Sequence, residues 1–178
     1  DVSFLAPWNV YHYYLNTKDF EELGYFDLYS CTLLADSEGG NIFGSATMAK
    51  DLYVYEDVQI DNLSLCPKSV FSVERWNEFK NDLASIHTLA PDDYWQASIR
   101  DKGFNATPFW TAWVQPFANT VDFQAFQYVT LIFNLDFIIL MGSLVVVSVV
   151  FGGVTACIIS VFALLYFGTY QGLLGNLF

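Results

Sequence analysis

The feature that most constrains this chain is the apolar run over residues 126–178. The run holds no Lys, Arg, His or Glu, and its only acid is Asp136. As one helix, its central part (128–167) would be about 60 Å long at about 1.5 Å per residue, whereas a bilayer core of about 30 Å needs about 20 residues. One membrane span is too few for this run, and two fit it. The sequence therefore predicts a transmembrane helical hairpin over 123–178.

The turn of this hairpin is predicted at Gly152-Gly153. A glycine pair breaks helices and tolerates the backbone angles of a tight turn. This position gives spans of about 127–149 and 154–172. A turn at Gly142-Ser143 is the alternative.

The preceding part of the chain, residues 1–122, is acidic and rich in aromatic residues. It carries 18 of the 19 acids and all 7 basic residues of a chain with net charge −12. So few basic residues argue against nucleic acid as a partner, because phosphate contacts need Lys and Arg. The acids are either a solvated surface, a site for cations or a surface for a basic protein partner. Aromatic residues just before the apolar run predict that 103–122 lies near a membrane interface.

Local patterns in residues 1–122 predict an α+β soluble domain. We expect a strand over 25–35, a strand or hairpin over 51–61 and a short helix from Pro91 to about Ile99. The clearest helix is predicted over about 69–87, capped by Ser72 or Ser69. Its apolar stripe recurs every three or four residues: Val73, Trp76, Phe79, Leu83 and Ile86.

Two features bear on the compartment of this domain. Cys31 and Cys66 either form a disulfide, which needs an oxidising compartment, or are two unrelated buried thiols. Asn62 and Asn105 each begin an Asn-X-Ser/Thr triplet, the acceptor pattern for N-glycosylation. Together with the scarcity of basic residues, these features favour a soluble domain on the non-cytosolic side (lumenal, intermembrane or extracellular) of a membrane.

The chain carries no recognisable catalytic or metal-binding motif. Its two histidines, His12 and His87, lie far apart in the sequence, and no CxxC, HExxH or GxSxG pattern occurs. No catalytic residue and no metal ligand is therefore predicted, and a protein without catalytic activity is favoured. No cofactor is indicated, and whether the chain binds pigment or lipid stays open.

Polar and small residues in the apolar run are candidates for function or packing. A carboxylate inside a membrane is costly, so Asp136 is either a functional group or a structural acid assisted by Asn134. Gly168, Gly172 and Gly175 form a small-residue face on which another helix can pack.

These observations predict an integral membrane protein that serves as a non-catalytic accessory or structural subunit. The hairpin would anchor it in the bilayer of a multi-subunit membrane complex, and the other membrane subunits would be its partners. The alternative is part of a polytopic transporter that moves protons or ions past Asp136. A receptor-like binding module is the third class, which requires the aromatic residues of 1–16 and 103–120 to be exposed.

Overall fold

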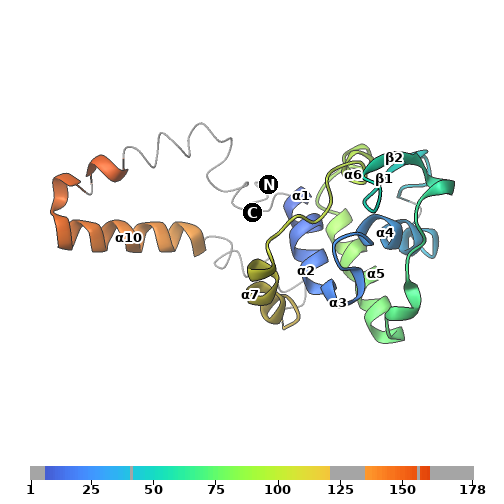
Figure 1. The fold of residues 1–178 in the computed structure, drawn as a ribbon, viewed down its shortest axis with the longest axis horizontal. Helices are drawn as coiled ribbons and strands as arrows, with labels where there is room; N and C mark the ends of the chain where they lie inside the picture. The colour runs from blue at the N-terminus through green and yellow to red at the C-terminus, as the bar shows by residue number, and fades with distance from the viewer. Residues whose placement is uncertain (1–6, 41, 121–134, 156, 161–178) are drawn as a thin grey trace. The chain divides into compact units, whose positions relative to one another are not determined.

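The computed structural model describes residues 7–40, 42–120, 135–155 and 157–160 (Figure 1). The chain divides into two compact units. We call residues 7–124 the N-terminal unit, and residues 1–6 with 125–178 the C-terminal unit. Each unit is described by itself.

The N-terminal unit opens with a nearly continuous helical segment in its core. This segment consists of α1 (Pro7–Asn9), the π-helical η1 (Val10–Leu15), α2 (Asn16–Lys18) and α3 (Phe20–Leu23). Proline suits a first helical position, because its fixed φ matches the helix and its missing N–H would have no partner there. Tyr11, Tyr14 and Leu15 are buried, so these side chains are part of the domain core.

The next element, α4 (Leu28–Ser37), contradicts the strand predicted over 25–35. Its buried residues include Leu28, Cys31, Thr32 and Ala35, which follow the helical spacing of three and four. This face packs on α5 and on β1. The strand prediction was wrong because it relied on the apolar content of the segment and not on this helical spacing.

A small antiparallel hairpin follows, made of β1 (Met48–Asp51) and β2 (Glu56–Gln59). Met48 pairs with Gln59 and Asp51 pairs with Glu56. Two 3-10 turns, η2 (Ile60–Asn62) and η3 (Lys68–Val70), lead from the hairpin to the long helix. Since this is the only sheet among the described residues, the unit is mostly helical, and the α+β prediction is wrong.

The long helix α5 (Val73–His87) confirms the prediction made from its apolar stripe. The Ser72 hydroxyl accepts a hydrogen bond from the Arg75 amide at 3.2 Å and so caps the helix. Trp76, Phe79, Leu83 and Ile86 are buried, whereas Val73 is exposed. The short helix predicted after Pro91 is also confirmed, as α6 (Asp92–Ser98), with Trp95 fully buried.

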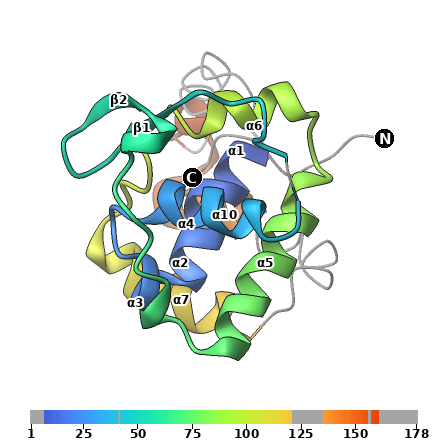
Figure 2. The same cartoon turned by 90° about the vertical axis from the view of Figure 1, so that its right-hand side faces the viewer.

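Helix α7 (Pro108–Ala118) completes the N-terminal unit and packs on α2. Thr107 caps it by accepting a hydrogen bond from the Trp110 amide, and Pro108 occupies its first turn. In both views α7 and α3 lie at the end of the unit opposite to α6 and the β-hairpin (Figures 1 and 2). Where the segment between α6 and α7 passes Leu52, Gly103 has φ 72°, and a Cβ there would lie 2.5 Å from a Leu52 methyl.

The C-terminal unit contains one long described helix, α10 (Leu135–Phe151). Gly152, with φ 89°, ends it in the manner of a C-terminal cap, and its amide bonds to the Ser148 carbonyl at 3.1 Å. Residues 153–155 and 157–160 are helical again. The backbone therefore breaks where the glycine pair predicted, whereas the helix runs without interruption through Gly142-Ser143, the alternative position.

The described residues do not contain the predicted transmembrane hairpin. None of their helices is both long enough and apolar enough to span a bilayer. Helix α10 has 17 residues, hence a length of about 26 Å against the roughly 30 Å of a bilayer core. The predictions of a membrane hairpin and of an integral membrane protein are therefore corrected.

Candidate functional site

A cluster of charged side chains joins α2 and α3 to α5. We call it the ion cluster, and it consists of Lys18, Asp19, Glu22, Arg75, Glu78 and Asp82. The Lys18 ammonium lies 2.5 Å from Asp82 and 2.8 Å from Glu78, and its side chain is only 2% exposed. Burial alone would lower the Lys18 pKa, but the hydrogen bonds that the ammonium donates to these two carboxylates outweigh it and raise the Lys18 pKa above its ordinary value. Lys18 therefore remains a cation while buried.

Arg75 is the second cation of the ion cluster and reaches three elements. Its Nη2 lies 2.7 Å from Asp19 Oδ1 and donates to the Lys18 carbonyl at 2.9 Å. Its Nε donates to Glu22 at 3.0 Å, and its Nη1 donates to the Asn119 side-chain oxygen just after α7. Burial raises the pKa of Asp19 to about 8, although Arg75 opposes this shift. Asp19 is fully buried, so no substrate reaches its carboxyl group. The contacts of Arg75 join α2, α3 and the end of α7 to α5.

A second buried polar group surrounds His12. Its Nδ1 lies 2.8 Å from the Trp8 carbonyl, which can only accept, so Nδ1 carries the proton and donates. Nε2 then accepts from the Tyr29 hydroxyl at 2.8 Å, and that hydroxyl accepts in turn from the Gly103 amide at 2.9 Å. Burial lowers the His12 pKa below its ordinary value. This arrangement holds η1, α4 and the segment around Gly103 together, and burial keeps it from acting as a catalytic base.

Acidification is expected to destabilise the N-terminal unit through His12. Since the folded pKa lies below the ordinary 6.5, the unfolded chain binds the extra proton as the pH falls through this value. The free energy of unfolding should then fall by up to about 1.4 kcal/mol per pH unit. Urea unfolding at about pH 7 and about pH 5 measures this change.

His12→Gln should remove this part of the pH dependence, and His87→Gln is the matched control. Asp19 acts in the opposite direction, because its raised pKa makes stability fall as the pH rises toward about 8. Comparing each variant with the wild type at the same pH cancels that contribution. An unchanged pH slope in His12→Gln would contradict the prediction.

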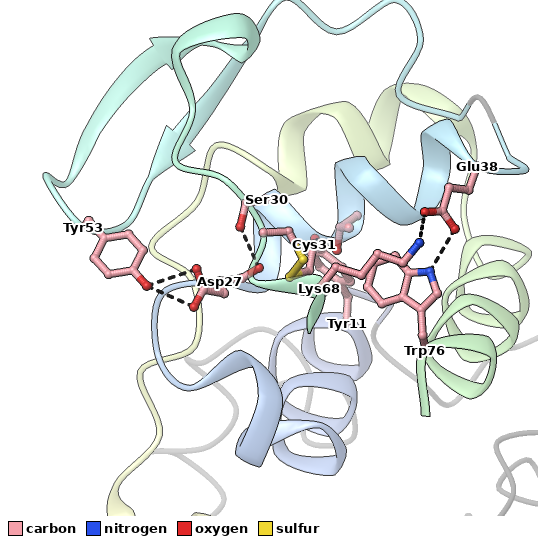
Figure 3. The surroundings of a disulfide bond; sticks show 10 residues. Tyr11, Asp27, Ser30, Cys31, Glu38, Tyr53, Lys68 and Trp76 are labelled. Atoms are coloured by element: carbon pink, nitrogen blue, oxygen red, sulfur yellow. Dashed lines mark hydrogen bonds and ion pairs between the residues drawn. A yellow bond between two sulfur atoms is a disulfide. The ribbon is translucent and has the colours of Figure 1, made fainter. Parts of the chain in front are cut away.

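The Cys31–Cys66 disulfide fastens α4 to the segment between η2 and η3 (Figure 3). It decides between the two alternatives that the sequence left open. Beside it, Glu38 accepts from Lys68 and from the Trp76 indole at 2.8 Å. These bonds, the Lys68 one foremost, lower the Glu38 pKa to about 2. Both ends of α4 are thus tied to residues 66–76.

Helix α7 presents an uncharged aromatic face at the surface. Phe109, Trp113 and Phe117 follow one another at intervals of four residues and are 77, 62 and 54% exposed. The Phe109 and Trp113 rings stack with centroids 6.5 Å apart. The helix contains no Lys, Arg, Asp or Glu. We call these three residues the α7 aromatic face. A group of exposed aromatic side chains on one face of a helix is typical of a surface that contacts another molecule.

Helix α10 leaves apolar side chains uncovered on several sides. Val145, Val146, Val149 and Val150 are all more than half exposed, as is Phe151. At about 100° per residue these positions spread around much of the helix rather than along one stripe. A helix that is apolar all round is normally buried. Its described side chains, residues 142–151, therefore form an exposed apolar surface.

The other residues predicted as sites have different fates. Asp136 is the second residue of α10, but its side chain lies outside the described part. Asn134, Gly168, Gly172 and Gly175 also lie outside the described residues. Within the ranges that the structure describes, no group of three or more His, Cys, Asp or Glu side chains could hold a metal ion.

Sequence reasoning did not find the ion cluster. Its two cations, Lys18 and Arg75, lie 57 residues apart in the sequence and belong to no recognisable motif. A partial signal existed, because Arg75, Glu78 and Asp82 are spaced by three and four residues and so share one side of α5. Nothing in the sequence indicates that η1 packs on α5 and brings Lys18 to that side.

Comparisons with known proteins identify no relative of this chain. No protein family, curated protein or solved structure matches it.

Proposed function

We propose that this chain is a non-catalytic accessory subunit of a larger protein assembly. The observation that carries the proposal is the apolar surface of α10, exposed on several sides. Burying a Val side chain contributes about 1.5–3 kcal/mol, so a partner that covers several of these residues gains substantial binding energy. The partner's contact surface is accordingly apolar.

The α7 aromatic face and the surplus of acids support the same proposal. Six of the seven basic side chains already form ion pairs with acids of this chain: Lys18, Lys50, Lys68, Arg75, Lys80 and Arg100. Exposed acids such as Glu21, Glu56 and Asp61 add to the net negative surface. The contact surface of a partner of the N-terminal unit would therefore carry apolar groups that pack on aromatic rings, and basic side chains that pair with the acids. The Asp136 side chain lies outside the described part of the chain, so no observed contact supports ion movement past it, and we do not propose this function.

Co-purification of the full chain from the cells that make it tests the proposal. The wild type should elute in a stoichiometric complex with other proteins. Val149→Lys, at a position 81% exposed on α10, should weaken this association tenfold or more. The reason is that loss of one buried Val and introduction of a charge cost at least about 1.5 kcal/mol, and about 1.4 kcal/mol corresponds to a factor of ten.

Val54→Lys is the matched control, because it places the same charge on an exposed Val between β1 and β2. It should leave the complex intact. Recovery of the wild-type chain alone, as a monodisperse monomer, would overturn the proposal. Equal association of Val149→Lys and the wild type would show that α10 is not the contact surface.

A further inference from the structure

The two Asn-X-Ser/Thr triplets occupy exposed positions in the N-terminal unit. Asn62 ends the 3-10 turn η2, and Asn105 lies in the extended segment between α6 and α7. Both side chains are exposed. An N-linked glycan is bulky and hydrated, so it fits only where the asparagine faces solvent. Both positions meet this requirement.

The side chain of Asn105 is held in a way that suits a glycan. The Tyr13 hydroxyl donates to its Oδ1 at 2.5 Å. An N-linked sugar attaches to Nδ2 and leaves Oδ1 free to accept. The hydrogen bond from Tyr13 therefore survives modification and orients the linkage.

The hydroxyl groups of both triplets have structural partners in the folded chain. Ser64 donates to Asp51 Oδ2 at 2.7 Å, and Thr107 accepts from the Trp110 amide as the cap of α7. Glycosyl transfer uses this hydroxyl for recognition of the acceptor asparagine, so these bonds compete with transfer. Modification then precedes the formation of α7 and of the Ser64–Asp51 contact.

The disulfide supplies an independent argument about where the chain folds. Cys66, four residues after Asn62, is bonded to Cys31. Structural disulfides form in oxidising compartments, which in eukaryotic secretion are also the place where asparagine glycosylation occurs. The same environment therefore provides for both modifications.

We propose that Asn62 and Asn105 each carry an N-linked glycan that is added before the N-terminal unit folds. In the reaction, Nδ2 attacks the anomeric carbon of an oligosaccharide linked to a polyprenyl diphosphate. The new C–N bond replaces the C–O bond to phosphate, the lipid diphosphate leaves, and the amide proton passes to a base of the transferase. No oxidation or reduction is involved. The proposal is independent of the accessory-subunit function, because neither asparagine lies on α10 or on the α7 aromatic face.

The test is mass spectrometry of the full chain purified from the cells that make it. Amidase release of N-glycans converts each modified Asn to Asp, so both Asn62 and Asn105 should be recovered as Asp after treatment and as glycopeptides before it. Recovery of either residue as unmodified Asn in untreated protein would overturn the assignment of that site. Deamidation without a matching glycopeptide counts against it too.

Variants expressed in the same cells provide a second readout. Asn62→Gln and Asn105→Gln should each remove one glycan-sized step in electrophoretic mobility, and Ser64→Ala and Thr107→Ala should remove the same steps while keeping the asparagine. Asn81→Gln, an exposed asparagine of α5 outside any triplet, should change nothing. Equal mobility of all five variants and the wild type would overturn the proposal.

Discussion

Reduction of the Cys31–Cys66 disulfide is expected to lower the free energy of unfolding by about 4 kcal/mol. The bond joins residues 35 positions apart, and closing a loop of this size restricts the unfolded chain substantially. A domain of ordinary stability has about 5–15 kcal/mol in total. The reduced N-terminal unit should therefore unfold at a much lower denaturant concentration. Guanidinium titration of the full chain with and without reductant measures the difference.

Two sets of variants sharpen this experiment. Cys31→Ala with Cys66→Ala should lose at least as much as reduction, because Cys31 is fully buried and its sulfur also packs in the core. Cys157→Ala changes an exposed free thiol and should leave the titration unchanged, with and without reductant. A midpoint that does not move on reduction would mean that the Glu38 contacts with Lys68 and Trp76 already hold α4 in place.

Local patterns predicted those parts of the fold in which one signal dominates. Helix α5 has a period of three to four, a serine cap and a charged opposite face, and all three agree. Gly152 ends α10 as expected, because glycine has no Cβ and adopts the positive φ of such a position without steric cost. In α4 the signals conflict: β-favouring Tyr and Thr stand in a segment whose buried positions have helical spacing. Packing on α5 and β1 decided the outcome, and this is a tertiary effect.

The candidate sites show the same division. The sequence indicated Cys31 and Cys66 as a possible disulfide. Whether they bond depends on the distance between them in the folded chain, which their separation in the sequence does not give. Lys18 and Asp82 are 64 residues apart, and the packing of the preceding η1 segment on α5 brings them together. The hairpin prediction failed for a further reason. Apolar length sets an upper limit on a span, but a helix break shortens it, and α10 ends after 17 residues.

Lys18→Met is expected to destabilise the N-terminal unit by about 3–5 kcal/mol. Methionine keeps most of the volume of lysine but removes the ammonium that lies 2.5 Å from Asp82 and 2.8 Å from Glu78. Asp82 is buried, so its carboxylate loses a close counter-charge that water cannot replace. Urea unfolding of the full chain at neutral pH measures the loss.

Lys80→Met is the matched control on the adjoining helix. Lys80 pairs with Glu38 at 3.3 Å, but its side chain is 31% exposed, and a pair screened in this way contributes at most about 1 kcal/mol. The same Lys→Met change should therefore be several times less costly at position 80. Similar losses for the two variants would contradict the view that burial makes the Lys18 pair important.

The double variant Lys18→Met with Asp82→Asn separates the charge from the packing. Asn has the shape of Asp but no charge, so Asp82→Asn removes the buried negative charge that loses its lysine in Lys18→Met. The free energy of unfolding of the double variant should therefore be about 1–3 kcal/mol higher than the value expected from adding the two single losses. Strict additivity would mean that the Lys18 and Asp82 side chains are not energetically coupled. In that case the Lys18–Glu78 pair would be the ionic link between α2 and α5, and the bonds of Arg75 to Asp19 and Glu22 would link α5 to α3 and the residue that precedes it.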